Sequence, residues 1–282
     1  MSRYSEMFAA LRARAEGAFV PFVMVGDPTP ALSEEVIEAL VAGGADALEL
    51  GVPFSDPVAD GPTIQRAHLR ALAAGAGFDA CLEVVVRVRL RHPGLPIGML
   101  IYGNVPFARG LESFYADCAR AGIDSVLLPD VPVRESAPFS AAARAAGVDA
   151  VYIAPPSAAE ETLDAVAAAS RGYVYAVSRV GVTGAEHASS TVGLAQSVAR
   201  LRADAAAPVM LGFGISRPEQ VAEAIAAGAD GAISGSATVA IVEEHAPALL
   251  TAPDGPERES ELAALRSELV DFVRAMKGAT RR

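Results

Sequence analysis

Lysine, cysteine and tryptophan are almost missing from this chain of 282 residues, which has one lysine, two cysteines and no tryptophan. The lysine is Lys277, near the C-terminal end, so no predicted strand offers a Schiff base to a carbonyl substrate or to pyridoxal phosphate. Cys81 and Cys118 fall in predicted helices, which disfavours both a thiolate nucleophile and a disulfide framework. We interpret them as reduced thiols and therefore expect a cytoplasmic protein.

Positive charge and histidine are also scarce. A net charge of −11 excludes the basic surface of a nucleic-acid binder, whereas backbone amides could still bind a small phosphate. His68, His92, His187 and His245 lie outside the predicted strands without metal-motif spacing, so we expect no metal. No apolar run reaches the ~18 residues of a membrane span, and G-x-S-x-G and Walker A motifs are absent. Acid–base chemistry by carboxylates remains.

The segments "AGGADALEL", "RAGIDSVLL", "RAAGVDAVYI" and "AAGADGAIS" share one pattern. An Ala-rich helix ends at a glycine, an aspartate turns the chain, and a short apolar strand follows. The strands are continuous apolar runs rather than alternating ones. This indicates burial on both faces, as in a parallel sheet covered by helices.

Eight strands of this kind are predicted, at 19–25, 46–51, 97–102, 124–129, 149–154, 173–178, 208–212 and 230–234. Eight strands alternating with helices predict an α/β fold, the (β/α)₈ or TIM barrel, whose usual length is about 250 residues. A doubly wound open sheet of six strands would leave two strands unexplained, and no G-x-G-x-x-G follows the first strand.

Two additions to the barrel are visible, one at each end of the chain. Met7, Phe8 and Leu11 recur at helical spacing before the first strand, which predicts an extra N-terminal helix that covers the barrel bottom. Residues 247–258 form a Pro/Gly-rich break, and a last amphipathic helix follows at about 259–277. We expect residues 1–282 to form a single barrel domain.

Glu49 is the strongest catalytic candidate because it ends a buried strand. If Leu48 and Leu50 face the outer helices, Glu49 points into the barrel mouth, where desolvation raises a carboxyl pKa and suits it to proton transfer. The alternative is a structural acid paired with a neighbour. Asp60 follows nearby in "ADGPTIQ", where the local pattern predicts a helix cap. Asp56 and Asp130 have the pattern of ordinary turn residues.

Two loops rich in small residues indicate a phosphate site. "GFGIS" (212–216) follows the seventh strand, and "SGSA" (234–237) follows the eighth and opens a helix. Loops after these two strands commonly bind phosphate in the barrel fold; the alternative is a pair of tight turns. The long loop after the sixth strand, "SRVGVTGAEHASSTVG" (178–193), has the composition of a lid or of an ordinary surface loop.

Taken together, these motifs resemble the tryptophan synthase alpha chain family. "EGAFVPFVMVGDP", "ELGVPFSDPVADGPTIQ", "PDVPVRESAPF", "SRVGVTGAE", "GFGIS" and "AISGSA" match in order and position over essentially the whole chain. The resemblance implies a lyase of tryptophan biosynthesis that cleaves indole-3-glycerol phosphate to indole and glyceraldehyde 3-phosphate. This is a retro-aldol reaction without a Schiff base or a metal.

The resemblance also implies roles for individual residues. Glu49 would be the acid/base that protonates the indole carbon and serves the glycerol hydroxyl, and Asp60 would stabilise positive charge at the indole N–H. The residues that would enclose the substrate are Phe22, Leu100, Tyr102, Tyr175 and Thr183. The phosphate would bind at Gly184, Phe213, Gly214, Gly235 and Ser236. Arg179 and Thr183 would belong to the lid.

A partner is implied as well, namely a beta chain in an α2β2 heterotetramer with an indole tunnel. That beta chain would carry pyridoxal phosphate, while this chain would need no cofactor. The residues that would face the beta chain are Pro53, Asp56, Asn104, Phe107, Pro129, Asp130 and Pro132, together with 153–156.

Three alternatives stay open at this point. The chain could be a stand-alone lyase that releases free indole, or a non-catalytic barrel that binds a phosphate compound, although intact Glu49 and Asp60 argue against the latter. It could also be another phosphate-binding barrel. A ribulose-phosphate epimerase would need metal ligands and an indole-glycerol-phosphate synthase would need a strand lysine, and the sequence offers neither.

Overall fold

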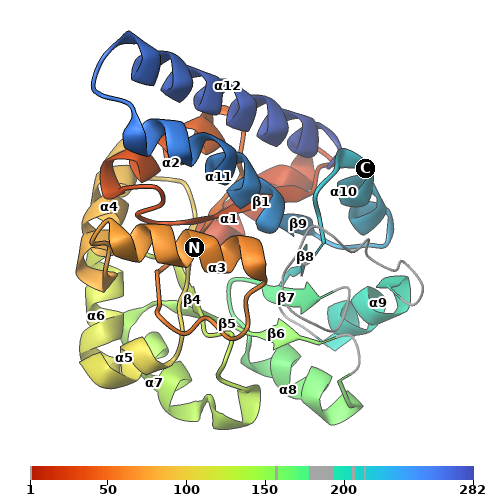
Figure 1. Cartoon of the computed structure of the whole chain (residues 1–282). Helices are drawn as coiled ribbons and strands as arrows, with labels where there is room; N and C mark the ends of the chain where they lie inside the picture. Colours follow the sequence, from red (N-terminus) through yellow and green to blue (C-terminus); the bar gives the residue numbers. More distant parts are fainter. Residues whose placement is uncertain (1, 156–157, 178–193, 205–206, 213) are drawn as a thin grey trace.

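Every strand pairing in the computed structural model is parallel, and the strands follow one another around a ring surrounded by helices (Figure 1). The structure describes residues 2–155, 158–177, 194–204, 207–212 and 214–282. Within them the strand order is β5-β4-β3-β2-β1-β9-β8-β7-β6. The strands are β1 (Ala18–Met24), β2 (Leu48–Gly51), β3 (Ile97–Leu100), β4 (Ser125–Leu127), β5 (Asp149–Val151), β6 (Ile153–Ala154), β7 (Val174–Val177), β8 (Val209–Gly212) and β9 (Gly231–Ser234).

The two ends of this order, β5 and β6, are two parts of one predicted strand. The predicted strand 149–154 is interrupted only at Tyr152, whose carbonyl accepts a hydrogen bond from the Tyr175 N–H at 3.1 Å. β5 pairs with β4 and β6 pairs with β7, so the interrupted strand joins the two ends of the order. The predicted eight-stranded barrel is therefore confirmed, with its fifth strand split.

Helices alternate with these strands. They are α1 (Arg3–Ala13), α2 (Pro30–Ala42), α3 (Pro62–Ala73), α4 (Phe78–Arg91), α5 (Asn104–Arg109), α6 (Leu111–Ala121), α7 (Ala137–Ala146), α8 (Glu160–Ala169), α9 (Leu194–Asp204), α10 (Pro218–Ala226), α11 (Ser236–Thr251) and α12 (Pro256–Gly278), with a 3₁₀ turn at Val133–Glu135. Local chemistry sets their ends. The Thr29 side chain caps α2 ahead of a proline, and left-handed Gly122 and Gly147 end α6 and α7.

The extra N-terminal helix, α1, covers one end of the barrel as predicted. Tyr4, Phe8 and Leu11 are buried and pack with residues of the barrel interior such as Tyr173 and Met210. Apolar side chains one helical turn apart thus form a single face, and that face closes the end of the barrel at which the strands begin.

The core has two layers, one inside the barrel and one between the strands and the helices. Leu48 and Leu50 belong to the outer layer. Because neighbouring side chains on a strand point to opposite faces, Glu49 between them points inward. The prediction that the two leucines face outward is confirmed.

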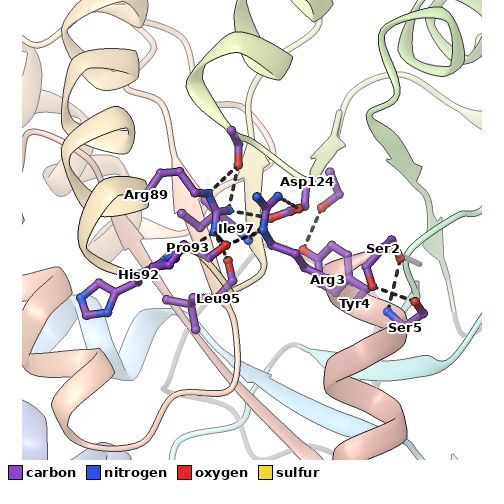
Figure 2. A network of polar contacts seen from close by, with 12 residues as sticks. Ser2, Arg3, Tyr4, Ser5, Arg89, His92, Pro93, Leu95, Ile97 and Asp124 are labelled. Atoms are coloured by element: carbon purple, nitrogen blue, oxygen red, sulfur yellow. Dashed lines mark hydrogen bonds and ion pairs between the residues drawn. The ribbon is translucent and has the colours of Figure 1, made fainter.

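Three of the four aspartates of the repeated pattern bind the start of the neighbouring strand. Asp46, Asp124 and Asp230 each accept the backbone N–H of a residue on the neighbouring strand, at 2.8, 2.8 and 3.0 Å respectively. Cations complete these sites. Asp124 pairs with Arg3 of α1 and Arg89 of α4, at 2.8 and 2.7 Å (Figure 2).

The break predicted at 247–258 is shorter than expected. α11 continues through Pro247 to Thr251, and α12 begins at Pro256. Proline removes a backbone hydrogen bond from a helix, but burial of Ala246 and Leu249 where α11 packs on α12 outweighs that cost. Figure 1 shows α12 running along the outside of α2 and α11.

Candidate active site

Glu49 lies inside the barrel and is 2 % exposed. It sits on β2 between Phe22 of β1 and Gly98 of β3. Its Oε1 accepts a hydrogen bond of 2.9 Å from the Tyr173 hydroxyl, and the Tyr173 ring packs edge-on against Tyr4 of α1. The carboxyl group is thus held by a neutral donor rather than by a cation.

Burial decides the protonation of Glu49. Desolvation raises its pKa to about 7, the Tyr173 hydrogen bond lowers it, and the nearby charge of Asp60 raises it. A carboxyl group with a pKa near neutrality can both give and accept a proton under physiological conditions. Among the described residues, Tyr173 is the hydrogen-bond partner of Glu49, and no arginine, lysine or histidine is paired with it.

Asp60 is buried and does not cap a helix. The residue that caps α3 is Gly61, and no side chain caps this helix. Instead, Asp60 Oδ2 accepts the Tyr102 hydroxyl at 2.7 Å and lies 3.2 Å from His68 Nε2. The helix-cap interpretation of Asp60 is therefore wrong, because more distant partners hold the carboxylate inward.

The only lysine of the chain lies at the opposite end of the barrel. Lys277 Nζ contacts Asp46 at 2.9 Å, Glu16 at 3.2 Å and the Gly17 carbonyl at 3.0 Å. These partners precede β1 and β2, so the amine stands where strands begin rather than where they end. Among the described residues, no cluster of histidine, cysteine and carboxylate side chains could hold a metal ion.

The described residues predicted to enclose the substrate lie in the barrel interior. Phe22, Tyr102 and Tyr175 are buried, and Leu100 packs against both interior clusters. Gly212 makes room for Tyr175, because a Cβ there would lie 2.2 Å from the tyrosine hydroxyl oxygen. Thr183 lies outside the described residues.

The predicted phosphate loops lie side by side. Ser234, at the end of β9, donates its hydroxyl to the Ile215 carbonyl at 2.7 Å and so joins the two loops. Gly235 caps α11, and Ser236 is its first residue, so the N–H groups of a long helix begin here. Gly214 has a φ of 77°, a conformation that favours glycine. Gly184 and Phe213 lie outside the described residues.

Comparisons with known proteins agree with this geometry. The family model described as tryptophan synthase alpha chain matches residues 8–270. The chain belongs to the tryptophan synthase alpha chain family. The tryptophan synthase alpha chain of Corynebacterium diphtheriae is 58% identical over 281 residues, covering 100% of both chains. That of Shewanella baltica is 52% identical over 278 residues, covering 99% of this chain and 97% of the relative.

Solved structures agree with this assignment. Tryptophan synthase of Mycobacterium tuberculosis matches with a TM-score of 0.84 at 32% identity, covering 100% of this chain and 99% of that one. The tryptophan synthase complex of Pyrococcus furiosus matches with a TM-score of 0.78 at 31% identity, covering 94% and 99%. The expectation of a lyase from the tryptophan synthase alpha chain family is confirmed.

Most residues that the resemblance places at a partner surface are accessible. Asp56, Asn104, Phe107, Asp130 and Pro132 are exposed, whereas Pro129 is half-buried and Pro53 is buried. The Asp130 side chain also accepts the Gly103 N–H at 2.8 Å, which ties the loop after β4 to the start of α5.

Three large apolar side chains are exposed on the loop after β2, on α3 and on α5. Val58 is 77 % exposed, Leu69 62 % and Phe107 76 %. Val58 and Leu69 line a shallow pocket of about 260 Å³ between the loop after β2 and α3. Leu69 was not predicted, because one exposed leucine on an amphipathic helix carries no signal in sequence. The predicted lid residues Arg179 and Thr183 lie outside the described residues.

Two residues of the site escaped prediction altogether. Tyr173 was placed at the edge of a strand without a role, and His68 was noted only for lacking a metal spacing. Tyr173 and its partner Glu49 are separated by 124 positions, whereas His68 and Asp60 are 8 positions apart. For His68 a signal did exist, because a histidine on the buried face of a helix needs polar partners.

Proposed function

We propose that Glu49 and Asp60 together cleave indole-3-glycerol phosphate in this lyase. The observation that carries the proposal is Glu49, a buried carboxyl group with a pKa of about 7 and a neutral hydrogen-bond donor. Retro-aldol cleavage needs an acid that protonates the ring carbon and a base that takes the hydroxyl proton, and one carboxyl group can do both in turn. Glu49 has that property, and Asp60 supplies a second carboxylate in the same interior.

The first step is protonation of the indole ring carbon that bears the glycerol chain. Glu49 donates its proton to this carbon, and positive charge develops at the ring nitrogen. The resulting Glu49 carboxylate then accepts the proton of the hydroxyl on the adjacent glycerol carbon. The carbon–carbon bond breaks, its electron pair restores the aromatic indole, and the hydroxyl carbon becomes the aldehyde of glyceraldehyde 3-phosphate. Glu49 ends the cycle protonated, as it began.

Asp60 acts on the charge that appears at the ring nitrogen. A carboxylate that accepts the indole N–H stabilises the cationic intermediate more than the neutral substrate, and so lowers the barrier. Tyr102 and His68 support this role because their contacts with Asp60 Oδ2 hold the carboxyl group in the barrel interior.

The phosphate of the substrate is assigned to the loops after β8 and β9. Gly214, Gly235 and Ser236 provide backbone N–H groups at or near the start of α11, where the helix dipole favours an anion. Phe22, Leu100 and Tyr175 provide an apolar wall for the indole ring. We propose no cofactor for this reaction.

We further propose that the chain works with a beta chain, in an α2β2 assembly in which the beta chain carries pyridoxal phosphate. The exposed apolar side chains of Val58 and Phe107 support a protein partner at this surface. Transfer of indole through a tunnel would keep an apolar product from escaping into water.

We place this single-domain enzyme in the cytoplasm. Cys81 and Cys118 are free and buried, as is common where thiols stay reduced. In the described part of the chain, no helix is long and apolar enough to cross a membrane.

The test of the chemistry is indole release from indole-3-glycerol phosphate by the purified chain. Glu49→Gln keeps the side-chain size but can no longer exchange a proton, so we expect the rate to fall by about 10²–10⁴-fold. Glu257→Gln, on the exposed start of α12, is the control and should match the wild type. Wild-type rates for Glu49→Gln would refute the assignment.

The test of the partner is the same assay with and without a purified beta chain. Stimulation of indole formation and a complex of two chains of each kind in light scattering are expected. An unchanged rate would favour the stand-alone lyase, and phosphate binding without any indole release would favour the non-catalytic barrel.

A further inference from the structure

His68 has both ring nitrogens engaged although it is buried, with 1 % of its surface exposed. The backbone N–H of Phe54 donates to Nδ1 at 2.9 Å, and Nε2 lies 3.2 Å from Asp60 Oδ2. A backbone N–H can only donate, so Nδ1 must accept and carries no proton in this arrangement. The ring proton therefore sits on Nε2 and is donated to Asp60.

The same oxygen of Asp60 receives a second donor that is fixed in a similar way. The Tyr102 hydroxyl accepts the Ala59 N–H at 3.0 Å and donates to Asp60 Oδ2 at 2.7 Å. The Tyr102 ring stacks on Phe54 with 5.2 Å between centroids. Two donors, each set by a backbone N–H of the loop between β2 and α3, thus converge on one carboxylate oxygen.

This arrangement fixes the orientation of the carboxylate. Both of these contacts act on Asp60 Oδ2, and no described residue donates a hydrogen bond to Oδ1. A carboxylate held at one oxygen by two separate donors can neither rotate nor swing without breaking a buried hydrogen bond, which costs free energy. The other oxygen is then the one available to a ligand.

We propose that His68 is a positioning residue for the cleavage reaction. Its Nε2–H, set by the Phe54 N–H, holds Asp60 so that Oδ1 faces the indole N–H of the substrate. This inference rests on the proposed function and deepens it, because it assigns the orientation of Asp60 to a residue on α3. A histidine that was merely buried and satisfied would have no influence on the rate of cleavage.

The test compares two substitutions that keep the volume of the site. His68→Gln places an amide nitrogen near the position of Nε2 and keeps the donor to Asp60, whereas His68→Leu removes it. We expect His68→Leu to lower kcat about tenfold with KM changed less than about twofold, since only the charge that develops in the transition state is affected. His68→Gln should recover kcat to within about threefold of the wild type.

Two controls separate this role from a structural one. His92→Gln changes a histidine that contacts Glu38 at the surface, away from Asp60, and should leave both constants unchanged. In an Asp60→Asn background, His68→Leu should lower kcat no further, because its route of action is already lost.

Three results would overturn the proposal: wild-type kcat in His68→Leu, equal losses in His68→Gln and His68→Leu, or a full further loss in the Asp60→Asn background. If His68→Leu does not fold by thermal unfolding, His68→Gln decides alone, and a tenfold loss of its kcat refutes the proposal. Failure of the proposed function is distinct, because the wild-type chain itself would then release no indole.

Discussion

Two sets of buried acids in this barrel have partners of opposite kinds. Where strands begin, Asp46 meets Lys277, Asp124 meets two arginines, and Asp230 lies 3.6 and 3.5 Å from Arg202 and Arg282. Inside the barrel and toward the strand ends, Glu49 and Asp60 meet only tyrosine hydroxyls and a histidine among the described residues.

This difference shows that carboxylates serve two purposes here, one in stability and one in activity. A carboxylate with a cation and a backbone N–H is charge-compensated, so its main contribution is to the stability of the fold. A carboxylate with neutral donors keeps its charge or its proton available for a ligand. Substitutions at the strand starts should therefore change stability, and those inside the barrel should change activity.

After that of Glu49→Gln, the largest expected effect is on activity, at Asp60. Asp60→Asn keeps an acceptor for Tyr102 but removes the negative charge, so the cationic intermediate loses its stabilisation. We expect kcat for indole release to fall by about 10²–10³-fold with little change in the urea midpoint. A large loss of stability with unchanged kcat would erase the contrast between the two ends.

The next effect is on stability, at Asp124. Asp124→Ala leaves Arg89 and the Ile97 N–H without their buried acceptor (Figure 2), and we expect the free energy of unfolding to fall by about 3 kcal/mol. Urea unfolding followed by circular dichroism measures it, with Glu257→Ala as the exposed control. The kcat of the folded variant should stay within about twofold of wild type.

A third prediction is that ionisation of Glu49 destabilises the folded chain, whereas the carboxylate of Asp124 stabilises it. Its pKa rises from 4.5 to about 7 on folding, so the folded chain keeps a proton that the unfolded chain has lost. Stability therefore falls as pH rises between these values, by at most about 3 kcal/mol. Glu49→Gln lacks this penalty and should be more stable than wild type at pH 8, but not at pH 4, in urea unfolding. Equal stability at pH 8 would contradict the raised pKa.

The smallest effect concerns two glutamates whose partner is a histidine, which is a cation only when it is protonated. His245 on α11 lies between Glu261 and Glu268 of α12. Burial lowers its pKa, but hydrogen bonds with both glutamates outweigh this, and the net shift is upward. Its contribution is thus complete below about pH 6.5 and is lost as pH rises through the folded pKa. His245→Gln should remove this pH dependence of stability. The contribution is about 1 kcal/mol or less, because the glutamates are partly exposed. Thermal unfolding across pH 6–9 measures it.

The strands and Glu49 could be located from the sequence because strands that are buried on both faces are continuous apolar runs. Leu48 and Leu50 fix the outer face, and the period of two then fixes the direction of Glu49. The aspartates of the repeat were also visible, although only the structure shows that Asp46 and Asp124 bond to the neighbouring strand.

Asp60 shows where local reasoning fails. An aspartate ahead of Gly-Pro predicts a helix cap, and the competing partner Tyr102 lies 42 positions away. Pro247 is a second example. A proline locally predicts the end of a helix, but α11 continues through it because α11 packs on α12. Through-space partners of this kind are set by the assembled barrel and leave no periodic signal.

The single lysine has a practical consequence. The Lys277 side chain is 18 % exposed, and its amine is held by Asp46, Glu16 and the Gly17 carbonyl. In the native chain, an acylating reagent should react slowly at this amine. Acylation at Lys277 would then report detachment of the end of α12, which makes one residue a chemical probe of local opening.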